Sequence, residues 1–202
     1  MPTQRNAMSF KDTYLITEDI FKDVSSSYVE NELGKKLASL IYQEKPKNVV
    51  EFGVLNGYST LWFGKAISSL ANRGHVYGYD LWDDYEHKHG VFADVQKRIV
   101  DNDLSDWITL GKMDIFEWAK HPPGFDLLHV DISNDGEKLE RLYNLLKDRP
   151  QTKGALMVFE GGTKERDEVE WMKKYNKKPI TETNIPYIVI EERFPGLSVV
   201  RL

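Results

Sequence analysis

Four acidic residues, Glu51, Asp80, Asp114 and Asp131, each end or follow a short apolar stretch of the sequence. Such stretches predict strands that are buried on both faces, as in a parallel sheet. In open α/β sheets, ligands bind at the edge formed by the carboxyl ends of the strands. A single acid at that edge is often only a solvated residue or a helix cap. Four acids at successive strand ends instead favour a ligand site whose carboxylates accept hydrogen bonds.

A glycine loop follows the first of these stretches, where residues 49–60 read VVEFGVLNGYST. Gly53 and Gly57 permit a tight turn and a close approach of a ligand to the backbone. The N–H groups of residues 58–60, at the start of the next helix, can receive an anion or a carboxylate. The spacing differs from the G-x-G-x-x-G of dinucleotide-binding domains. Turn geometry alone explains two such glycines equally well, so the interpretation as a site depends on the neighbouring acids.

The combined pattern resembles the class I S-adenosylmethionine-dependent methyltransferases, and within them the small-molecule O-methyltransferase-like branch. The first motif of the resemblance is Glu51-x-Gly53-x-x-x-Gly57-x-Ser59-Thr60. It implies that Glu51 orients the ammonium group of S-adenosylmethionine, directly or through water. It also implies that Gly53 and Gly57 flank the methionine part of this cofactor, beside Ser59 and Thr60.

The same resemblance assigns the adenosine part of the cofactor to the second and third strand ends. Asp80 is expected to accept hydrogen bonds from both ribose hydroxyls, as acids do in nucleotide-binding sheets. Asp114 is expected to bind the adenine together with the backbone of Ile115. Trp82 is expected to pack on the adenine or the ribose, although ordinary core packing explains this tryptophan at least as well.

The fourth and fifth strand ends carry the residues expected to act on the methyl acceptor, which are Asp131, Glu160 and His129. Methyl transfer from a sulfonium needs in-line positioning of the acceptor and, where necessary, its deprotonation. His129 and Asp131 point to the same face of their strand. Many members of the branch carry a histidine shortly after this aspartate, whereas residues 133–135 read SND here. The general base is therefore open among the three, and His129 is more readily interpreted as a hydrogen-bonded core residue.

A divalent cation is the alternative to a carboxylate base. In metal-dependent relatives, the residue at Asp131 would bind Mg²⁺ or Ca²⁺ together with an Asp-Asn pair after the fifth strand. Glu160 and two glycines take that place here, so the amide ligand is absent. Hard cations prefer several oxygen ligands, which favours a metal-free site, with Asp131 and Glu160 as the ligands if a metal binds. His87 and His89 could hold a transition metal, but a polar loop beside the substrate is the preferred interpretation.

The elements that would position these residues alternate between strands and helices, which is typical of a parallel α/β sheet. Strands are expected at 48–53, 75–80, 107–110, 125–131, 154–160, 187–191 and 197–202, and helices at 27–44, 58–72, 91–101, 135–148 and 163–175. The expected fold is Rossmann-like, with a mostly parallel sheet of about seven strands, helices on both faces and a C-terminal antiparallel hairpin. We expect the hairpin to insert antiparallel, so that 187–191 does not run parallel to 48–52.

Residues 27–202 are expected to form one S-adenosylmethionine-dependent methyltransferase domain, preceded by an N-terminal arm or lid at 1–26. This arm contains large apolar residues without an obvious core position, namely Phe10, Tyr14, Leu15, Ile16 and Phe21. They are expected to cover the cofactor site or to pack on a second subunit, and symmetric homodimers are the commonest soluble oligomers.

The composition limits the remaining functions. Of 202 residues, 41% are hydrophobic and 29% charged, which predicts an ordinary soluble protein, and a cytoplasmic location is expected. The absence of cysteine excludes disulfides and thiolate chemistry. No stretch predicts a membrane helix or a signal peptide. The net charge of −5 argues against a nucleic-acid partner, so the expected partner is a small-molecule acceptor substrate.

The predicted function is methyl transfer from S-adenosylmethionine to a small polar acceptor, with a hydroxyl oxygen of a sugar or secondary metabolite favoured. One alternative is a non-catalytic, nucleotide-binding Rossmann-like module, because a fold does not determine a function. The other is a nicotinamide-dependent oxidoreductase, which the missing third glycine and the terminal hairpin oppose.

Overall fold

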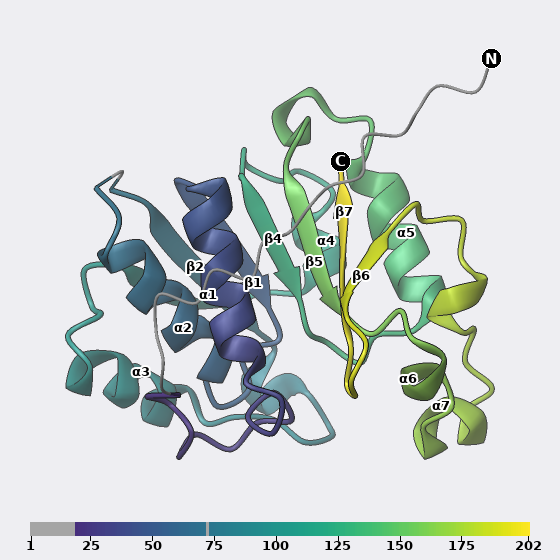
Figure 1. Cartoon of the computed structure of the whole chain (residues 1–202), viewed down its shortest axis with the longest axis horizontal. Helices are drawn as coiled ribbons and strands as arrows, with labels where there is room; N and C mark the ends of the chain where they lie inside the picture. Colours follow the sequence, from purple (N-terminus) through teal and green to yellow (C-terminus); the bar gives the residue numbers. More distant parts are fainter. Residues whose placement is uncertain (1–18, 72) are drawn as a thin grey trace.

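The centre of the molecule is one seven-stranded sheet, seen in a computed structural model that describes residues 19–71 and 73–202 (Figure 1). The strands are β1 (Asn48–Phe52), β2 (His75–Asp80), β3 (Ile108–Lys112), β4 (Leu127–Val130), β5 (Leu156–Glu160), β6 (Ile188–Glu191) and β7 (Leu197–Arg201). Their order across the sheet is β3-β2-β1-β4-β5-β7-β6. The chain moves outward from β1 to β3 and then returns to β4 on the other side of β1. Ligands of such sheets bind at this reversal, outside the carboxyl ends of the strands.

Strands β1 to β5 run parallel, and β7 is antiparallel to both of its neighbours, β5 and β6. The predicted mostly parallel sheet with an antiparallel terminal hairpin is therefore confirmed. The expected direction of 187–191 was wrong, because β6 runs in the same direction as β1. The second strand of the hairpin, β7, inserts beside β5 and leaves the first strand at the outer edge. Sequence order does not reveal which strand of a hairpin becomes the neighbour of the sheet.

Helices cover both faces of the sheet, as predicted (Figure 1). The longer helices are α1 (Leu33–Glu44), α2 (Tyr58–Ser68), α3 (Phe92–Asp101) and α5 (Gly136–Leu146), and the shorter ones are α4 (Ile115–Trp118), α6 (Lys164–Asp167) and α7 (Glu170–Lys174). Single 3-10 turns occur at η1 (Trp82–Asp84), η2 (Pro150–Thr152) and η3 (Ile180–Glu182). Successive residues of β1 alternate between the faces, so Val49 packs with α1, α2 and α3 while Val50 packs with α4 and α5.

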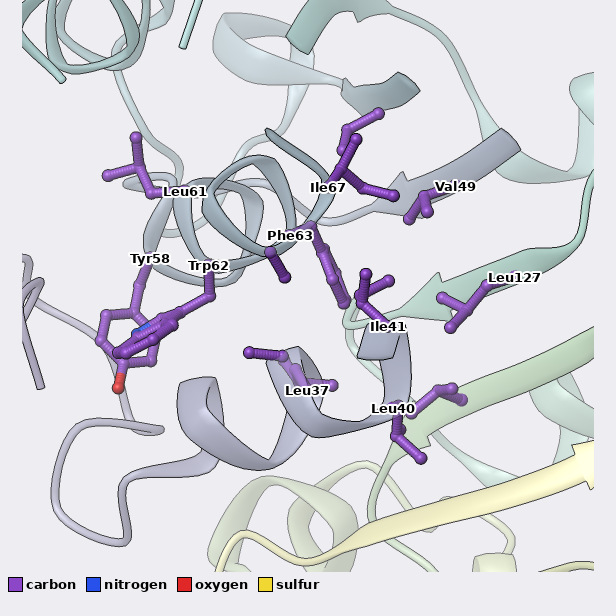
Figure 2. Close-up of a cluster of buried hydrophobic side chains, with 14 of the residues drawn as sticks. Leu37, Leu40, Ile41, Val49, Tyr58, Leu61, Trp62, Phe63, Ile67 and Leu127 are labelled. Carbon is purple, nitrogen blue, oxygen red and sulfur yellow. The ribbon is translucent and has the colours of Figure 1, made fainter. Parts of the chain in front are cut away.

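Figure 2 shows the core on the first face, where apolar side chains of α1 and α2 meet over Val49 of β1 and Leu127 of β4. Trp62 and Phe63 of α2 and Leu37 of α1 have no exposed surface. Full burial of such a side chain contributes about 1.5–3 kcal/mol relative to leaving it exposed. This packing fixes the position of α2, and therefore of the glycine loop that precedes it.

The predicted helix 58–72 ends earlier, at Ser68 of α2, and two other predicted helices differ more strongly from the observed ones. The stretch 27–32 forms turns, with Glu32 at a φ of +53°, and α1 begins only at Leu33. The predicted helix 163–175 is split into α6 and α7 by Val169, whose backbone is extended. The carboxylate of Asp167 accepts hydrogen bonds from the N–H groups of Ile180 and Thr181 at 2.8 and 2.9 Å. Because these contacts tie the end of α6 to a distant segment, local periodicity could not predict the break.

The segment before α1 packs on the same core. Phe21, which has no obvious core position in the sequence, is 4% exposed and lies edge-on against Trp62, with ring centroids 5.4 Å apart. The other large apolar residues of the predicted arm, Phe10, Tyr14, Leu15 and Ile16, lie outside the described residues. Within 19–71 and 73–202, no helix has the length and apolar character needed to cross a membrane.

Candidate active site at the carboxyl edge of the sheet

Glu51 lies at the centre of a buried polar cluster beneath the first turn of α2. Its side chain has no exposed surface, and its carboxylate oxygens accept hydrogen bonds from the hydroxyls of Ser59 and Thr60. His129, directly opposite on β4, places Nδ1 2.9 Å from Oε1 of Glu51. These donors satisfy the carboxylate, as burial of a charged group requires. Glu51 therefore presents no free surface in this arrangement, and its expected contact with an ammonium group stays a prediction.

Tyr28 connects this cluster to Asp131. Its hydroxyl lies 3.3 Å from Nε2 of His129 and hydrogen-bonds with the carboxyl of Asp131. Burial raises the pKa of Tyr28 well above its usual value, and the charges of Asp131, Glu160 and Glu51 raise it further. The hydroxyl therefore keeps its proton and acts as a donor. No motif or periodicity marks Tyr28, which comes from the turns before α1, and sequence reasoning missed it.

The glycine loop and Asp131 are in direct backbone contact. Gly53 has a φ of +93°, and a Cβ there would lie 1.9 Å from the carbonyl oxygen of Asp131. The N–H of Asp131 in turn donates to the carbonyl of Phe52 at 2.8 Å. Gly57, with a φ of +86°, precedes α2, and a Cβ there would lie 2.8 Å from Cγ1 of Val95. Only glycine fits these positions without displacing a neighbour, so the sequence motif has a structural requirement behind it.

Asp80 holds the glycine loop from the side of β2. Its Oδ2 accepts a hydrogen bond from the N–H of Leu55 at 2.9 Å, and its Oδ1 accepts one from the N–H of Trp82 at 3.1 Å. The indole of Trp82 is buried and donates its N–H to the carbonyl of Gly111 at 2.9 Å. Core packing therefore accounts for Trp82. The expected contacts of Asp80 and Trp82 with an adenosine group stay predictions.

Asp114 caps the start of α4. Its Oδ1 accepts hydrogen bonds from the N–H groups of Phe116 and Glu117 at 2.8 and 3.0 Å. The cap fixes the backbone of Ile115, whose side chain is buried. Because β2 and β3 are neighbours, Asp80 and Asp114 follow adjacent strand ends. This is the arrangement expected of two acids that share one adenosine group, although the contact itself is untested.

Asp131 follows β4 and Glu160 ends the neighbouring strand β5, so the two carboxyls lie close enough to interact. Burial raises the pKa of Asp131 well above its usual value, and the charge of Glu160 raises it further. Two adjacent carboxyls with little access to solvent resist ionising together. Asp131 is therefore the member of the pair whose ionisation is opposed most clearly.

Glu160 is also ion-paired with Arg166 of α6. Nε of Arg166 lies 2.6 Å from Oε1 of Glu160, and both residues are buried. The guanidinium lies over the ring of Trp171, 5.3 Å from its centroid. Asn134 joins the two strand ends, because its side-chain amide donates to the carbonyls of Val130 and Glu160 at 2.9 and 3.0 Å. Sequence reasoning missed Arg166, because nothing in a short charged helix indicates that its arginine turns inward.

The donor set at this edge does not fit a divalent cation. Among residues 19–71 and 73–202, no group of three or more His, Cys, Asp or Glu side chains could hold a metal ion. Glu160 is already occupied by Arg166, and Asp131 alone offers too few oxygens for a hard cation. His87 and His89 are exposed, and Nδ1 of His89 lies 2.8 Å from the carbonyl oxygen of His87.

The strand order, the glycine loop and the acids at the carboxyl edge define a Rossmann-like methyltransferase fold. The model of a family described as a methyltransferase domain matches residues 50–160, which is more than half of the chain. The chain therefore belongs to this methyltransferase domain family, as the sequence motifs indicate. No curated protein matches the sequence.

Solved structures with the same fold include methyltransferases of low sequence identity. Methyltransferase PaMTH1 of Podospora anserina, bound to SAH, has a TM-score of 0.63 and 13% identity, over 89% of this chain and 80% of that one. TomG of Streptomyces achromogenes, an O-methyltransferase of tomaymycin synthesis in complex with SAM, has a TM-score of 0.59 and 13% identity, over 93% and 92%. The O-methyltransferase of Bacillus cereus in complex with SAH has a TM-score of 0.59 and 14% identity, over 91% and 87%. At these identities, the likeness shows the shared fold.

Proposed function

We propose that this protein transfers a methyl group from S-adenosylmethionine to a hydroxyl oxygen of a small polar acceptor, such as a sugar or a secondary metabolite. The observation that carries the proposal is the backbone contact between Gly53 and Asp131. It joins the loop expected to bind the cofactor to the carboxyl expected to act on the acceptor. Complexes of TomG with SAM and of the Bacillus cereus enzyme with SAH support this choice of cofactor.

The main task of the cofactor site is to position S-adenosylmethionine, because the cofactor itself carries the reactive group. When bound, S-adenosylmethionine supplies a methyl group on a positively charged sulfur that is already activated for displacement. In our proposal, Gly53 and Gly57 flank the methionine part, and their positive φ values shape the loop that binds it. Asp80 accepts hydrogen bonds from the ribose, while Asp114 and the backbone of Ile115 bind the adenine. Glu51 acts from beneath the loop by fixing the first turn of α2 through Ser59 and Thr60.

Asp131 is the residue that we propose to accept the proton of the hydroxyl. A carboxyl with a raised pKa is a stronger base than an ordinary exposed one, and burial and Glu160 raise the pKa of Asp131. Arg166 holds Glu160 beside Asp131 through an ion pair of 2.6 Å. His129 has no exposed surface, so it contributes through Tyr28 and does not contact the acceptor.

A non-catalytic nucleotide-binding module is the second candidate function. Two features favour it, because each removes a candidate base: Glu160 is ion-paired with Arg166, and His129 is completely buried. Asp131 is then the one remaining candidate among the three. The family match to a methyltransferase domain argues against a nicotinamide-dependent oxidoreductase. We further propose a cytoplasmic protein without a nucleic-acid partner, in line with its lack of cysteine and its net charge of −5.

Calorimetric titration with S-adenosylmethionine, its demethylated product and NAD tests the proposal. We expect the first two to bind and NAD not to bind. A screen of small hydroxyl compounds with isotopically labelled S-adenosylmethionine then separates the enzyme from the non-catalytic module, since only an enzyme transfers the label. Failure of both S-adenosyl compounds to bind the folded protein would contradict the proposed cofactor.

A further inference from the structure

Arg166 places a permanent positive charge at the carboxyl pair of Asp131 and Glu160. The guanidinium stays protonated in proteins, and its Nε lies 2.6 Å from Oε1 of Glu160. The pair is buried, with Arg166 4% and Glu160 8% exposed. Charges attract each other more strongly in the protein interior than in water, because the interior has a lower dielectric constant. The arginine is therefore the dominant counter-charge of Glu160. A second cation beside Glu160 would be repelled by the first.

The backbone between Glu160 and Arg166 is shaped to permit this ion pair. Gly161 and Gly162 have φ values of +102° and +90°, a region that favours glycine. A Cβ on Gly161 would lie 3.2 Å from Cγ of Arg166 and 2.7 Å from Cδ1 of Ile180. The turn therefore needs glycine both for its conformation and for the space that the arginine side chain fills. Thr163 then caps α6, because its side-chain oxygen accepts a hydrogen bond from the N–H of Arg166. Arg166 is the third residue of this helix, and its side chain faces inward.

The surroundings fix the orientation of the guanidinium. Trp171 of α7 packs against it, with its ring centroid 5.3 Å from Cζ. Nη2 lies 3.5 Å from the carbonyl oxygen of Asn134, and the amide of the same asparagine donates to the carbonyl of Glu160. The arginine is thus held from both sides and is built into the end of the sheet, unlike an exposed ion pair that can exchange partners.

We propose that Arg166 is the resident cation of the acceptor site, where it positions Glu160 beside Asp131 and excludes divalent metal ions from the pair. Arg166 is a positioning residue in this role, because it acts through Glu160. The consequence for methyl transfer, that turnover does not depend on a divalent cation, rests on the proposed function. The consequence for metal binding does not, and it can be measured without a known acceptor.

Mn²⁺ is the probe, because electron paramagnetic resonance counts the free ion and Mn²⁺ takes the same oxygen ligands as Mg²⁺. We expect the wild-type protein to leave Mn²⁺ free at millimolar concentrations. Arg166→Met keeps an unbranched side chain but removes the charge, so the two carboxyls lose their counter-ion. This variant is expected to bind Mn²⁺ at least about tenfold more tightly than the wild type. Adding Glu160→Gln to Arg166→Met should abolish the gain.

Arg166→Lys is the matched control, because it retains the positive charge and should not gain affinity for Mn²⁺. Saturable binding by the wild type that Glu160→Gln abolishes would overturn the proposal. Binding by folded Arg166→Met that is no tighter than that of the wild type would overturn it as well. If circular dichroism shows that Arg166→Met does not fold, the wild-type and Arg166→Lys titrations decide. Calorimetry with S-adenosylhomocysteine on the same samples reports separately on the proposed cofactor site.

Discussion

Opposing influences meet at the carboxyl of Asp131. Burial and Glu160 raise its pKa, whereas the hydrogen bond with Tyr28 lowers it, and the net result is a pKa well above the usual value. A base must be ionised before it can accept a proton. Turnover is therefore expected to fall as the pH drops through this raised pKa, at a pH above the ordinary carboxyl range.

Replacing Asp131 by asparagine removes the proposed base but keeps the shape of the side chain. We expect turnover to fall by roughly 10²–10⁴-fold, the usual contribution of general base catalysis. Calorimetry should show nearly unchanged affinity for S-adenosylhomocysteine, because the backbone contact with Gly53 is retained. Near-normal turnover would make Asp131 a structural strand-end acid.

The same variant has a second readout in stability. The pKa of Asp131 is higher in the folded state than in the unfolded state. Its contribution is therefore fully present below the unfolded-state pKa and is lost as the pH rises through the folded-state value. Asp131→Asn cannot ionise, so its unfolding free energy should lack this part of the decline, which urea titrations at several pH values would measure.

Tyr28→Phe tests the link between Asp131 and the buried cluster. The variant removes the hydroxyl that lies 3.3 Å from His129 and hydrogen-bonds with Asp131. Because that hydrogen bond lowers the pKa of Asp131, its loss should move the acidic limb of the pH–rate profile to higher pH. The loss of hydrogen bonds should also cost about 1 kcal/mol of stability. A profile that moves to lower pH, or does not move, would contradict the assignment.

Asp80→Ala is expected to weaken binding of S-adenosylmethionine by roughly 1–3 kcal/mol, because charged acceptors contribute about that much to hydrogen bonds. The structure adds a complication, since Asp80 also holds the N–H groups of Leu55 and Trp82. Asp80→Asn is the matched control, because its amide oxygen can still accept from one of them. Calorimetry on both variants, with thermal unfolding as a check on the loop, separates the two roles. Unchanged affinity in Asp80→Ala would remove this residue from the ribose site.

At the scale of single residues, the sequence predicts those side chains that a motif places at a strand end. Glu51, Asp80 and Asp131 fall in this group, because strands and their order determine where such residues meet. Tyr28 and Arg166 do not, because each enters the site from a turn or a short helix through tertiary packing. Local periodicity contains no information on that packing.

At the scale of helices and strands, some features are likewise predicted by the sequence and others are not. The range His75–Asp80 of β2 agrees with its prediction, because an apolar run with clear ends defines it. The split of α6 from α7 depends on the contact of Asp167 with Ile180 and Thr181, which are distant in sequence. The direction of β6 depends on which hairpin strand pairs with β5. Both features are decided by contacts between elements, and no pattern within either element predicts them.

The turn between β1 and α2 gives an element-scale test. Gly53→Ala adds a Cβ that would lie 1.9 Å from the carbonyl oxygen of Asp131, whereas nothing lies within 4 Å of the corresponding atom in Gly154→Ala. Both glycines have positive φ, so both variants incur the left-handed strain of about 1–2 kcal/mol. Overpacking should make Gly53→Ala less stable by about a further 1–3 kcal/mol. Equal urea midpoints for the two variants would show that the backbone at Asp131 can shift to accommodate the added Cβ. Close packing would then not require glycine at position 53.

For the whole molecule, the N-terminal arm is the part whose role is tested last. The described chain begins beside the glycine loop, where the hydroxyl of Tyr58 donates to Asp19 at 2.5 Å. The side-chain amide of Asn56 likewise donates to the carbonyl of Ser25 at 2.9 Å. Asp19 and Ser25 therefore lie beside the proposed cofactor site. We accordingly propose that the N-terminal arm, residues 1–26, covers the site, with packing on a second subunit as the alternative.

Deletion of residues 1–18 tests the two roles while leaving Asp19 and Phe21 in place. If the segment covers the cofactor, affinity for S-adenosylhomocysteine should fall several-fold at unchanged mass, because contacts that exclude water are lost. If it joins two subunits, light scattering should show a lower mass. Asp19→Ala is the control for the loss of the Tyr58 contact alone, since it keeps the segment but removes the acceptor. A truncated protein with the mass and the affinity of the full chain would exclude both roles, and the function of the domain would then reside in residues 19–202.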